Sequence, residues 1–217
     1  MGPVDYSLYL VTDAELAGGR SHSQIAAAAI RGGVTVVQYR EKNASTRRMV
    51  GEALELRQLC RSYNVPFIIN DRLDVALAVD ADGVHLGQDD MPADLARQLI
   101  GPGKILGVSV ENVSQARRAM EDGADYVGAS PIFATPTKPD APPPMGIRGL
   151  QELARVCTLP IVAIGGLNAS NAAAVLRAGA TGLAVVSAIV SADDVELAAR
   201  ELKQIISAGT HRSLPDS

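Results

Sequence analysis

The sequence of 217 residues is poor in cysteine and in long apolar runs, and each shortage excludes a class of protein. Its two cysteines, Cys60 and Cys157, lie in helical patterns without the paired spacing of a metal site. No apolar run approaches the roughly 20 residues that a membrane-spanning helix needs. The first residues lack the basic flank and apolar region of a signal peptide. We therefore expect a cytoplasmic protein that has no membrane partner.

An excess of one charge is also missing. Twenty lysines and arginines stand against 24 aspartates and glutamates, and neither sign forms a long run. Proteins that bind nucleic acid or anionic membranes carry a basic patch, so we expect neither partner. Any anion site must instead be a local concentration of arginine and lysine. The sequence leaves the oligomeric state open, a homo-oligomer included.

Histidine is scarce as well, with only His22, His85 and His211 present, and none lies in a metal-binding or catalytic-triad pattern. His85 falls inside a predicted strand, where we expect a hydrogen-bonded core histidine rather than a catalytic base. The predicted strand over residues 126–132 contains no lysine, which argues against a Schiff-base aldolase. The sequence is typical of a site that stabilises a leaving polyanion rather than one that moves protons.

What the sequence does contain is a regular alternation of short apolar strands and helices. The predicted strands span residues 7–12, 34–42, 66–70, 83–87, 105–110, 126–132, 160–164 and 182–189, and the predicted helices span residues 23–30, 46–63, 73–79, 95–100, 113–120, 150–156, 171–177 and 195–206. Eight strand–helix repeats with short buried strands are what a closed parallel barrel requires. We predict a protein of the α/β class, a single (β/α)8 TIM-barrel domain over residues 1–217, with a disordered tail from about residue 210. A doubly wound open sheet is the alternative.

In such barrels the active site lies at the carboxyl ends of the strands. The second predicted strand ends in Gln38, Arg40 and Lys42, which share one face because side chains alternate along an extended chain. Two cations and an amide then converge at the end of this strand, which predicts an anion site. The alternative is a solvated strand end with scattered charges.

Two aspartates follow adjacent predicted strands, so the carboxylates of Asp71 and Asp90 can meet at one edge of the barrel mouth, beside Asn70. Carboxylate oxygens suit Mg²⁺, which usually binds one or two carboxylates together with phosphate oxygens. Each aspartate could instead cap the helix that follows it. Because the two aspartates would lie opposite Arg40 and Lys42, we favour the other interpretation, a magnesium ion held against a polyanion.

The connection over residues 134–146 is long for a barrel, and it begins with two threonines and Lys138 before a run of prolines. Loops of about this length are usually functional or disordered, so we predict a lid that brings Lys138 over a bound phosphate. A flexible surface loop is the alternative. Gly166 follows the seventh predicted strand and Ser187 lies near the end of the eighth, where barrels frequently bind phosphate through backbone N–H groups. Two anionic groups would then bind at once.

Seven motifs follow one another at the predicted strand ends. They are Gln-Tyr-Arg-Glu-Lys at 38–42, Asn-Asp at 70–71, Gly-Val-His-Leu-Gly-Gln-Asp-Asp at 83–90, Gly-Val-Ser at 107–109, Thr-Pro-Thr-Lys at 135–138, Ile-Gly-Gly at 164–166 and Val-Val-Ser-Ala-Ile at 185–189. Over nearly its whole length the chain thereby resembles the thiamine-phosphate synthase (thiamine-phosphate pyrophosphorylase) family. The resemblance implies a Mg²⁺-assisted, dissociative coupling of hydroxymethylpyrimidine diphosphate with a thiazole phosphate or its carboxylated form. The products would be thiamine phosphate and pyrophosphate.

The resemblance also implies a role for particular residues. The pyrimidine diphosphate would bind at Gln38, Tyr39, Arg40, Glu41, Lys42, Asn70, Ser109 and Lys138, of which Arg40, Lys42, Ser109 and Lys138 would be catalytic. The thiazole phosphate would bind at Thr135, Pro136, Thr137, Gly166, Val186 and Ser187, and Mg²⁺ would bind at Asp71 and Asp90. The family commonly carries a His-Thr pair after the serine, where this chain has Val110-Glu111-Asn112. This departure bears on the contact with the pyrimidine edge and not on the diphosphate or metal positions.

Two other functions stay open at this point. A thiazole tautomerase of the same fold would need no diphosphate and magnesium site, so Asp71, Asp90, Arg40 and Lys42 favour coupling. A non-catalytic, phosphate-binding barrel with a regulatory role would bind its ligand without turnover.

Overall fold

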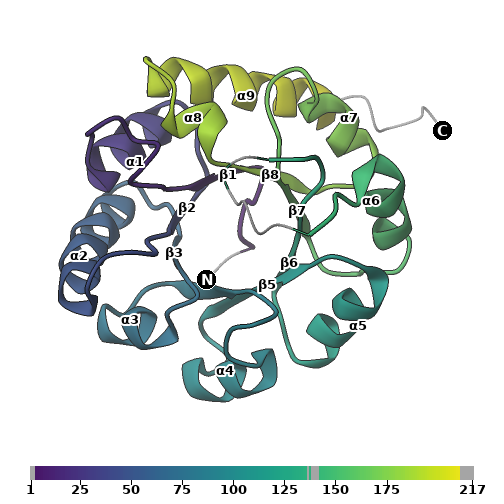
Figure 1. Cartoon of the computed structure of the whole chain (residues 1–217), viewed down its shortest axis with the longest axis horizontal. Helices are drawn as coiled ribbons and strands as arrows, with labels where there is room; N and C mark the ends of the chain where they lie inside the picture. Colours follow the sequence, from purple (N-terminus) through teal and green to yellow (C-terminus); the bar gives the residue numbers. More distant parts are fainter. Residues whose placement is uncertain (1–2, 136, 138–141, 211–217) are drawn as a thin grey trace.

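The structure, a computed structural model, describes residues 3–135, 137 and 142–210. Eight parallel strands pair in the order of the sequence, and the last pairs with the first to close a barrel (Figure 1). The strands are β1 Leu8–Val11, β2 Val36–Tyr39, β3 Phe67–Asn70, β4 Gly83–Leu86, β5 Ile105–Val110, β6 Tyr126–Ala129, β7 Ile161–Ile164 and β8 Gly182–Val185. The predicted (β/α)8 barrel is confirmed, and the open-sheet alternative is wrong.

The helices lie outside the ring of strands (Figure 1). They are α1 His22–Arg31, α2 Thr46–Ser62, α3 Leu73–Ala78, α4 Ala93–Ile100, α5 Val113–Glu121, α6 Gly146–Ala154, α7 Ala172–Arg177, α8 Ser187–Val190 and α9 Val195–Thr210. Among the described residues, none of these helices has the length and apolar composition of a membrane span. The predicted disordered tail falls, from residue 211 onward, outside the described residues.

Three of the predicted strands are too long by three residues or more, the sixth because β6 ends at Ala129. β2 ends at Tyr39, so Arg40 and Lys42 belong to the loop that follows it. β8 ends at Val185, and the short helix α8 follows at Ser187. Val186 between them has φ −114° and ψ −88°, which lies outside the β region, so the strand cannot continue through it. An apolar run alone did not reveal this change of backbone direction.

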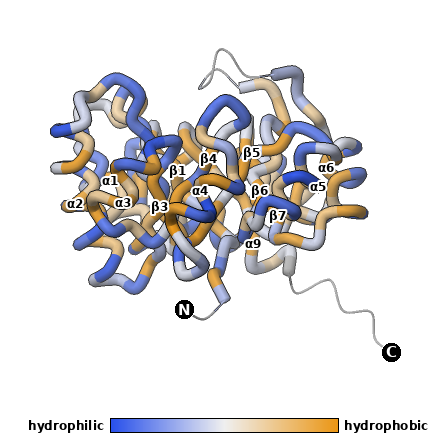
Figure 2. Tube along the Cα trace, turned by 90° about the horizontal axis from the view of Figure 1, so that it is seen from below, coloured by the Kyte–Doolittle hydropathy of each residue, from blue (hydrophilic) through white to orange (hydrophobic). Residues whose placement is uncertain are grey.

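Both faces of the strands are buried, as expected for a parallel sheet covered by helices. β1 shows the alternation, because Tyr9 and Val11 join a cluster inside the barrel while Leu8 and Leu10 join the larger cluster between strands and helices. In Figure 2, which views the barrel from the side, the hydrophilic residues lie on the connecting turns and on parts of the outer helices. The strands therefore form a rigid frame, and their ends carry the polar side chains.

A close approach inside the barrel requires glycine at position 107 in β5. A Cβ there would lie 2.2 Å from the ring carbon Cζ of Tyr126, which fills this part of the interior. Tyr126 is 1% exposed, and its ring packs against that of Tyr9, with centroids 5.9 Å apart. The sequence thus makes room for large aromatic side chains beneath the mouth of the barrel.

Candidate active site

A cavity of about 300 Å³ opens at the carboxyl ends of the strands, and each of the eight strands or the loop after it contributes to its lining. Most of the predicted site residues meet here. Those that line the cavity are Gln38, Arg40, Lys42, Asn70, Asp71, Asp90, Ser109, Thr135, Thr137, Gly166, Val186 and Ser187. The strand-end rule for barrels therefore located the cavity correctly.

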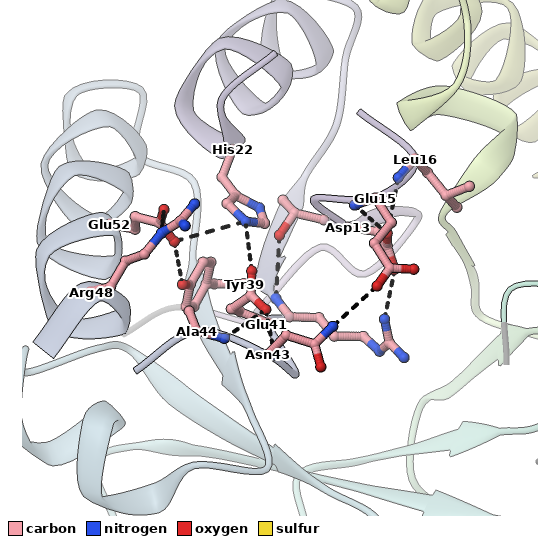
Figure 3. A network of polar contacts seen from close by, with 12 residues as sticks. Asp13, Glu15, Leu16, His22, Tyr39, Glu41, Asn43, Ala44, Arg48 and Glu52 are labelled. Atoms are coloured by element: carbon pink, nitrogen blue, oxygen red, sulfur yellow. Dashed lines mark hydrogen bonds and ion pairs between the residues drawn. The ribbon is translucent and has the colours of Figure 1, made fainter. Parts of the chain in front are cut away.

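Four predicted site residues are not brought to the cavity by the described structure. Tyr39 is buried on the outer side of the barrel, where its hydroxyl donates to Glu52 Oε2 at 2.6 Å (Figure 3). Glu41 also turns away from the cavity, toward the helices. The alternation along β2 continues past its end, so Arg40 and Lys42 face the mouth while their neighbours face outward. Pro136 and Lys138 lie outside the described residues, so the lid stays a prediction.

The two cations at the mouth are each paired with a carboxylate. Lys42 Nζ donates to Asp71 Oδ2 at 2.5 Å, and Arg40 Nη1 donates to Asp13 Oδ2 at 2.7 Å. Our sequence reasoning missed Asp13, although it directly follows Thr12 near the end of β1, so the same strand-end rule could have found it. Glu111, which lines the cavity, was not among the predicted site residues. Each of the two cations at the mouth thus has its charge offset by a carboxylate.

Neither Asp71 nor Asp90 caps a helix, so the capping alternative is wrong for both. The residues at the start of α3 and α4 are Arg72 and Pro92, and neither helix has a side-chain cap. Asp90 instead accepts a hydrogen bond from the N–H of Gly87 at 2.7 Å. Burial, and after it the Asp71 carboxyl, raises the pKa of Asp90. Two carboxylates are therefore crowded at the edge of the cavity.

Below the mouth, five side chains form one chain of hydrogen bonds. Gln38 Nε2 donates to the Tyr9 hydroxyl at 2.9 Å, and the two tyrosine hydroxyls lie 2.8 Å apart. Tyr126 then meets His85 Nδ1 at 2.9 Å, and His85 Nε2 meets Ser109 Oγ at 2.9 Å. The Gln38 amide donates to Tyr9, and either direction of the remaining bonds leaves one hydroxyl proton over. We assign the direction from Tyr9 to Ser109, because it leaves over the proton of the partly exposed Ser109 rather than that of Tyr9, which is only 1% exposed.

This direction decides what the site presents to a ligand. His85 accepts at Nδ1 and donates from Nε2, which leaves the Ser109 proton free to point into the cavity. Burial lowers the pKa of His85 to about 4, so its ring is neutral at neutral pH. The expectation of a hydrogen-bonded histidine that supports the site is met by these contacts. Tyr9 and Tyr126 gave no signal in the sequence, because both look like ordinary core residues.

The opposite side of the mouth is built differently. β7 and β8 lie four strands away from β3 and β4 in the ring of eight, so Gly166 and Ser187 stand across the cavity from Asp71 and Asp90. Gly166 has φ 64°, and a Cβ on it would lie 2.7 Å from the carbonyl oxygen of Ala134. A side chain at this position would therefore be strained and would clash with the loop. The edge of the cavity at Asp71 and Asp90 therefore carries charged side chains, whereas at Gly166 on the opposite edge the backbone itself lines the cavity.

Comparison with known proteins decides the family. A family model described as thiamine monophosphate synthase matches residues 8–189, which is most of the chain. The chain belongs to the thiamine monophosphate synthase family. The resemblance based on seven motifs is thereby confirmed.

Relatives in the thiamine monophosphate synthase family match almost end to end. The thiamine-phosphate synthase of Chloroflexus aurantiacus is 62% identical over 211 residues, which are 97% of each chain. That of a Roseiflexus species is 52% identical over 201 residues, covering 93% of this chain and 85% of the relative. A solved structure of thiamine phosphate pyrophosphorylase from Pyrococcus furiosus is 42% identical, has a TM-score of 0.88 and covers 94% of this chain and 97% of its own.

Proposed function

We propose that the cavity couples 4-amino-5-hydroxymethyl-2-methylpyrimidine diphosphate with hydroxyethylthiazole phosphate, or its carboxylated form, to give thiamine phosphate and pyrophosphate, with carbon dioxide as a further product from the carboxylated form. One observation carries this proposal: Lys42 is paired with Asp71, next to Asp90, at the edge of one cavity. A diphosphate bound with a divalent cation needs positive side chains against its oxygens and carboxylates against the metal. This edge supplies both. The two partners of the protein would be small phosphorylated molecules.

Magnesium fits the donor set at Asp71 and Asp90. Both offer hard carboxylate oxygens, and their proximity is what raises the pKa of Asp90 in addition to burial. A positive charge nearby favours the ionised form of both carboxylates and offsets their mutual repulsion. Bound there, Mg²⁺ would supply positive charge against the oxygens of the departing diphosphate.

The remaining residues divide between the two substrates. Arg40 and Lys42 would bind the diphosphate, because both line the cavity on the side of the carboxylates. Gln38, Asn70 and Ser109 would hold the pyrimidine diphosphate from below, where the free proton of the Ser109 hydroxyl offers a donor. The thiazole phosphate would bind across the mouth, at the lining residues Thr135, Thr137, Gly166, Val186 and Ser187.

The proposed coupling of hydroxyethylthiazole phosphate needs no general acid or base; with the carboxylated form, the carboxyl group leaves as carbon dioxide and a proton from water takes its place. The bond between the exocyclic carbon of the pyrimidine and the diphosphate oxygen breaks, and its electron pair leaves with the diphosphate. The thiazole nitrogen then uses its own lone pair to form the new carbon–nitrogen bond. His85 supports this route, because it is neutral and both of its ring nitrogens are already hydrogen-bonded. Arg40 and Lys42 would lower the barrier by stabilising the charge on the leaving group.

The test is turnover by the purified full chain with both substrates and Mg²⁺. We expect pyrophosphate and thiamine phosphate in equal amounts, and neither product when one substrate or Mg²⁺ is omitted. The Asp71→Asn variant should lose this activity. Asp74→Asn is a matched control, because Asp74 is exposed on α3 and pairs with Arg72 away from the cavity.

Three results would contradict the proposal. The first is an absence of pyrophosphate release in the presence of both substrates. The second is isomerisation of the carboxylated thiazole without coupling, which would make the chain a tautomerase. The third is binding of both substrates in calorimetry without turnover, which would make it a regulatory barrel.

A further inference from the structure

A second group of ligand-type side chains lies outside the cavity, between α1 and α2 (Figure 3). His22 is the first residue of α1, Glu41 lies in the loop after β2, and Glu52 lies in α2. One ligand atom from each comes within 4.8 Å of the other two. His22 Nε2 is 3.8 Å from Glu41 Oε2 and 3.9 Å from Glu52 Oε2. Glu41 belongs to the motif at residues 38–42, but His22 and Glu52 belong to none of the seven motifs, and the proposed coupling reaction uses none of the three.

The Nε2 atom of the His22 ring lacks a hydrogen-bond partner among the described residues. This atom is buried, and the side chain is only 6% exposed. Leaving a buried polar atom unpaired costs about 1–3 kcal/mol. The ring is nevertheless held in place, because it stands edge-on to Tyr39 with centroids 4.9 Å apart. A complete capping box at Ser21 also holds the start of α1, so Nε2 is kept facing the two carboxylates.

The two carboxylates are oriented by neighbours of their own. Glu52 Oε1 accepts from Arg48 Nε at 2.8 Å, and Glu52 Oε2 accepts from the Tyr39 hydroxyl. Glu41 Oε1 accepts from two backbone N–H groups of the loop that follows it. Its other oxygen, Oε2, faces His22. Such outer hydrogen bonds are what orients the ligands of a metal site.

We propose that His22, Glu41 and Glu52 bind one divalent transition-metal ion, with zinc preferred. Zinc is bound by imidazole nitrogen and carboxylate oxygen at about 2.0–2.2 Å in tetrahedral geometry, so its ligands lie roughly 3.4 Å apart. His22 Nε2 is 3.8 and 3.9 Å from the two carboxylate oxygens, so a bound ion would draw each carboxylate closer by only about 0.5 Å. The imidazole favours zinc over Mg²⁺, which prefers oxygen ligands alone. Two carboxylates balance the charge of the ion in this buried place.

The competing explanation is a protonated His22 shared between the carboxylates. A proton shared in this way would draw the groups together, because charge-assisted hydrogen bonds between nitrogen and carboxylate oxygen are about 2.7–2.9 Å long. His22 Nε2 is instead 3.8 and 3.9 Å from the two carboxylate oxygens, which leaves a gap between the three groups. The neutral imidazole is the form that binds a metal.

A metal here would join three parts of the chain: α1, α2 and the loop after β2. Glu41 stands between Arg40 and Lys42, which face the cavity. The ion would therefore anchor the loop that carries both cations of the mouth, without taking part in the proposed reaction. The inference is independent of the proposed function, because it concerns side chains on the outer side of that loop.

The test is the metal content of the full chain. Protein stripped with a chelator is dialysed against Zn²⁺ with an excess of Mg²⁺, and bound zinc is counted by mass spectrometry. Asp71→Asn with Asp90→Asn serves as the background, because these carboxylates at the mouth could also take zinc. We expect one zinc ion per chain in this background. Adding His22→Gln should abolish retention, since loss of even an outer partner weakens metal sites by roughly 10–100-fold.

Glu55→Gln is the control, because Glu55 lies exposed on α2 and outside the cluster. It should retain the ion. The proposal is overturned if no zinc is retained, or if His22→Gln retains as much as the control.

A second measurement needs no substitution in the cluster. The chain has only three histidines, so ¹⁵N-histidine NMR of the unsubstituted protein gives a simple spectrum. The His22 signals can be identified by the contact of its ring with Tyr39. Zn²⁺ should shift the His22 Nε2 signal, and Mg²⁺ should leave it unchanged. A zinc-induced shift at His85 alone, or at no histidine, would refute the site even where His22→Gln fails to fold.

Discussion

The buried His85 predicts a pH-dependent loss of stability with a size that follows from the structure. Burial lowers the pKa of His85 in the folded protein to about 4, against an ordinary value of 6.5. As the pH falls, the unfolded chain therefore binds this proton first. The stability that the neutral ring contributes is complete above the unfolded pKa and declines as the pH falls toward the folded value.

The expected magnitude comes from these two pKa values. Between about pH 7.5 and about pH 5.0, the linkage relation gives a loss of about 2 kcal/mol in the free energy of unfolding from His85 alone. His85 sits in the hydrogen-bonded chain beneath the mouth, so solvent does not screen this effect. The loss should continue until the folded protein itself takes up the proton, near pH 4.

The assay is urea unfolding at both pH values for the natural chain and for His85→Gln. Glutamine keeps an amide nitrogen in reach of Ser109 but has no titrating ring. Carboxylates and His22 titrate in both proteins, so their contributions cancel in the comparison. We expect the variant to be less stable at about pH 7.5 but to lose about 2 kcal/mol less on going to about pH 5.0. Equal losses in the two proteins would refute a buried, neutral His85.

Three further predictions concern the mouth and the barrel interior. Asp71→Asn and Asp90→Asn should each lower Mg²⁺-dependent turnover by about 100-fold or more, measured as pyrophosphate release; near-normal rates in both would remove the metal assignment. Arg40→Lys should raise KM for the pyrimidine diphosphate by roughly ten-fold, because a point charge replaces a planar fork, and an unchanged KM would count against contact with the diphosphate. Gly107→Ala should lower the free energy of unfolding by about 1–3 kcal/mol or more, since its Cβ would meet Tyr126, whereas Gly103→Ala, with open space around it, should change it by only about 0.5 kcal/mol in urea unfolding.

Most of the candidate site was predictable because the barrel converts positions in the sequence into positions in space. Each strand ends at the same rim, so the sequence alone was enough to assign Gln38, Asn70 and Ser109 to one cavity. The prediction that Tyr39 and Glu41 lie at the cavity failed, because a motif contains residues from both faces of a strand and only one face reaches the cavity. Asp13 was missed because no motif drew attention to the end of β1.

The sequence by itself determined the order and type of the elements, because hydrophobic periodicity and helix-ending residues act over a few neighbours in the chain. Only the tertiary structure decided which distant side chains meet. The pairing of Lys42 with Asp71, the chain from Gln38 to Ser109, and the group of His22, Glu41 and Glu52 all join different elements. These contacts depend on closure of the barrel and on the path of each loop, and neither is encoded in any local stretch of residues.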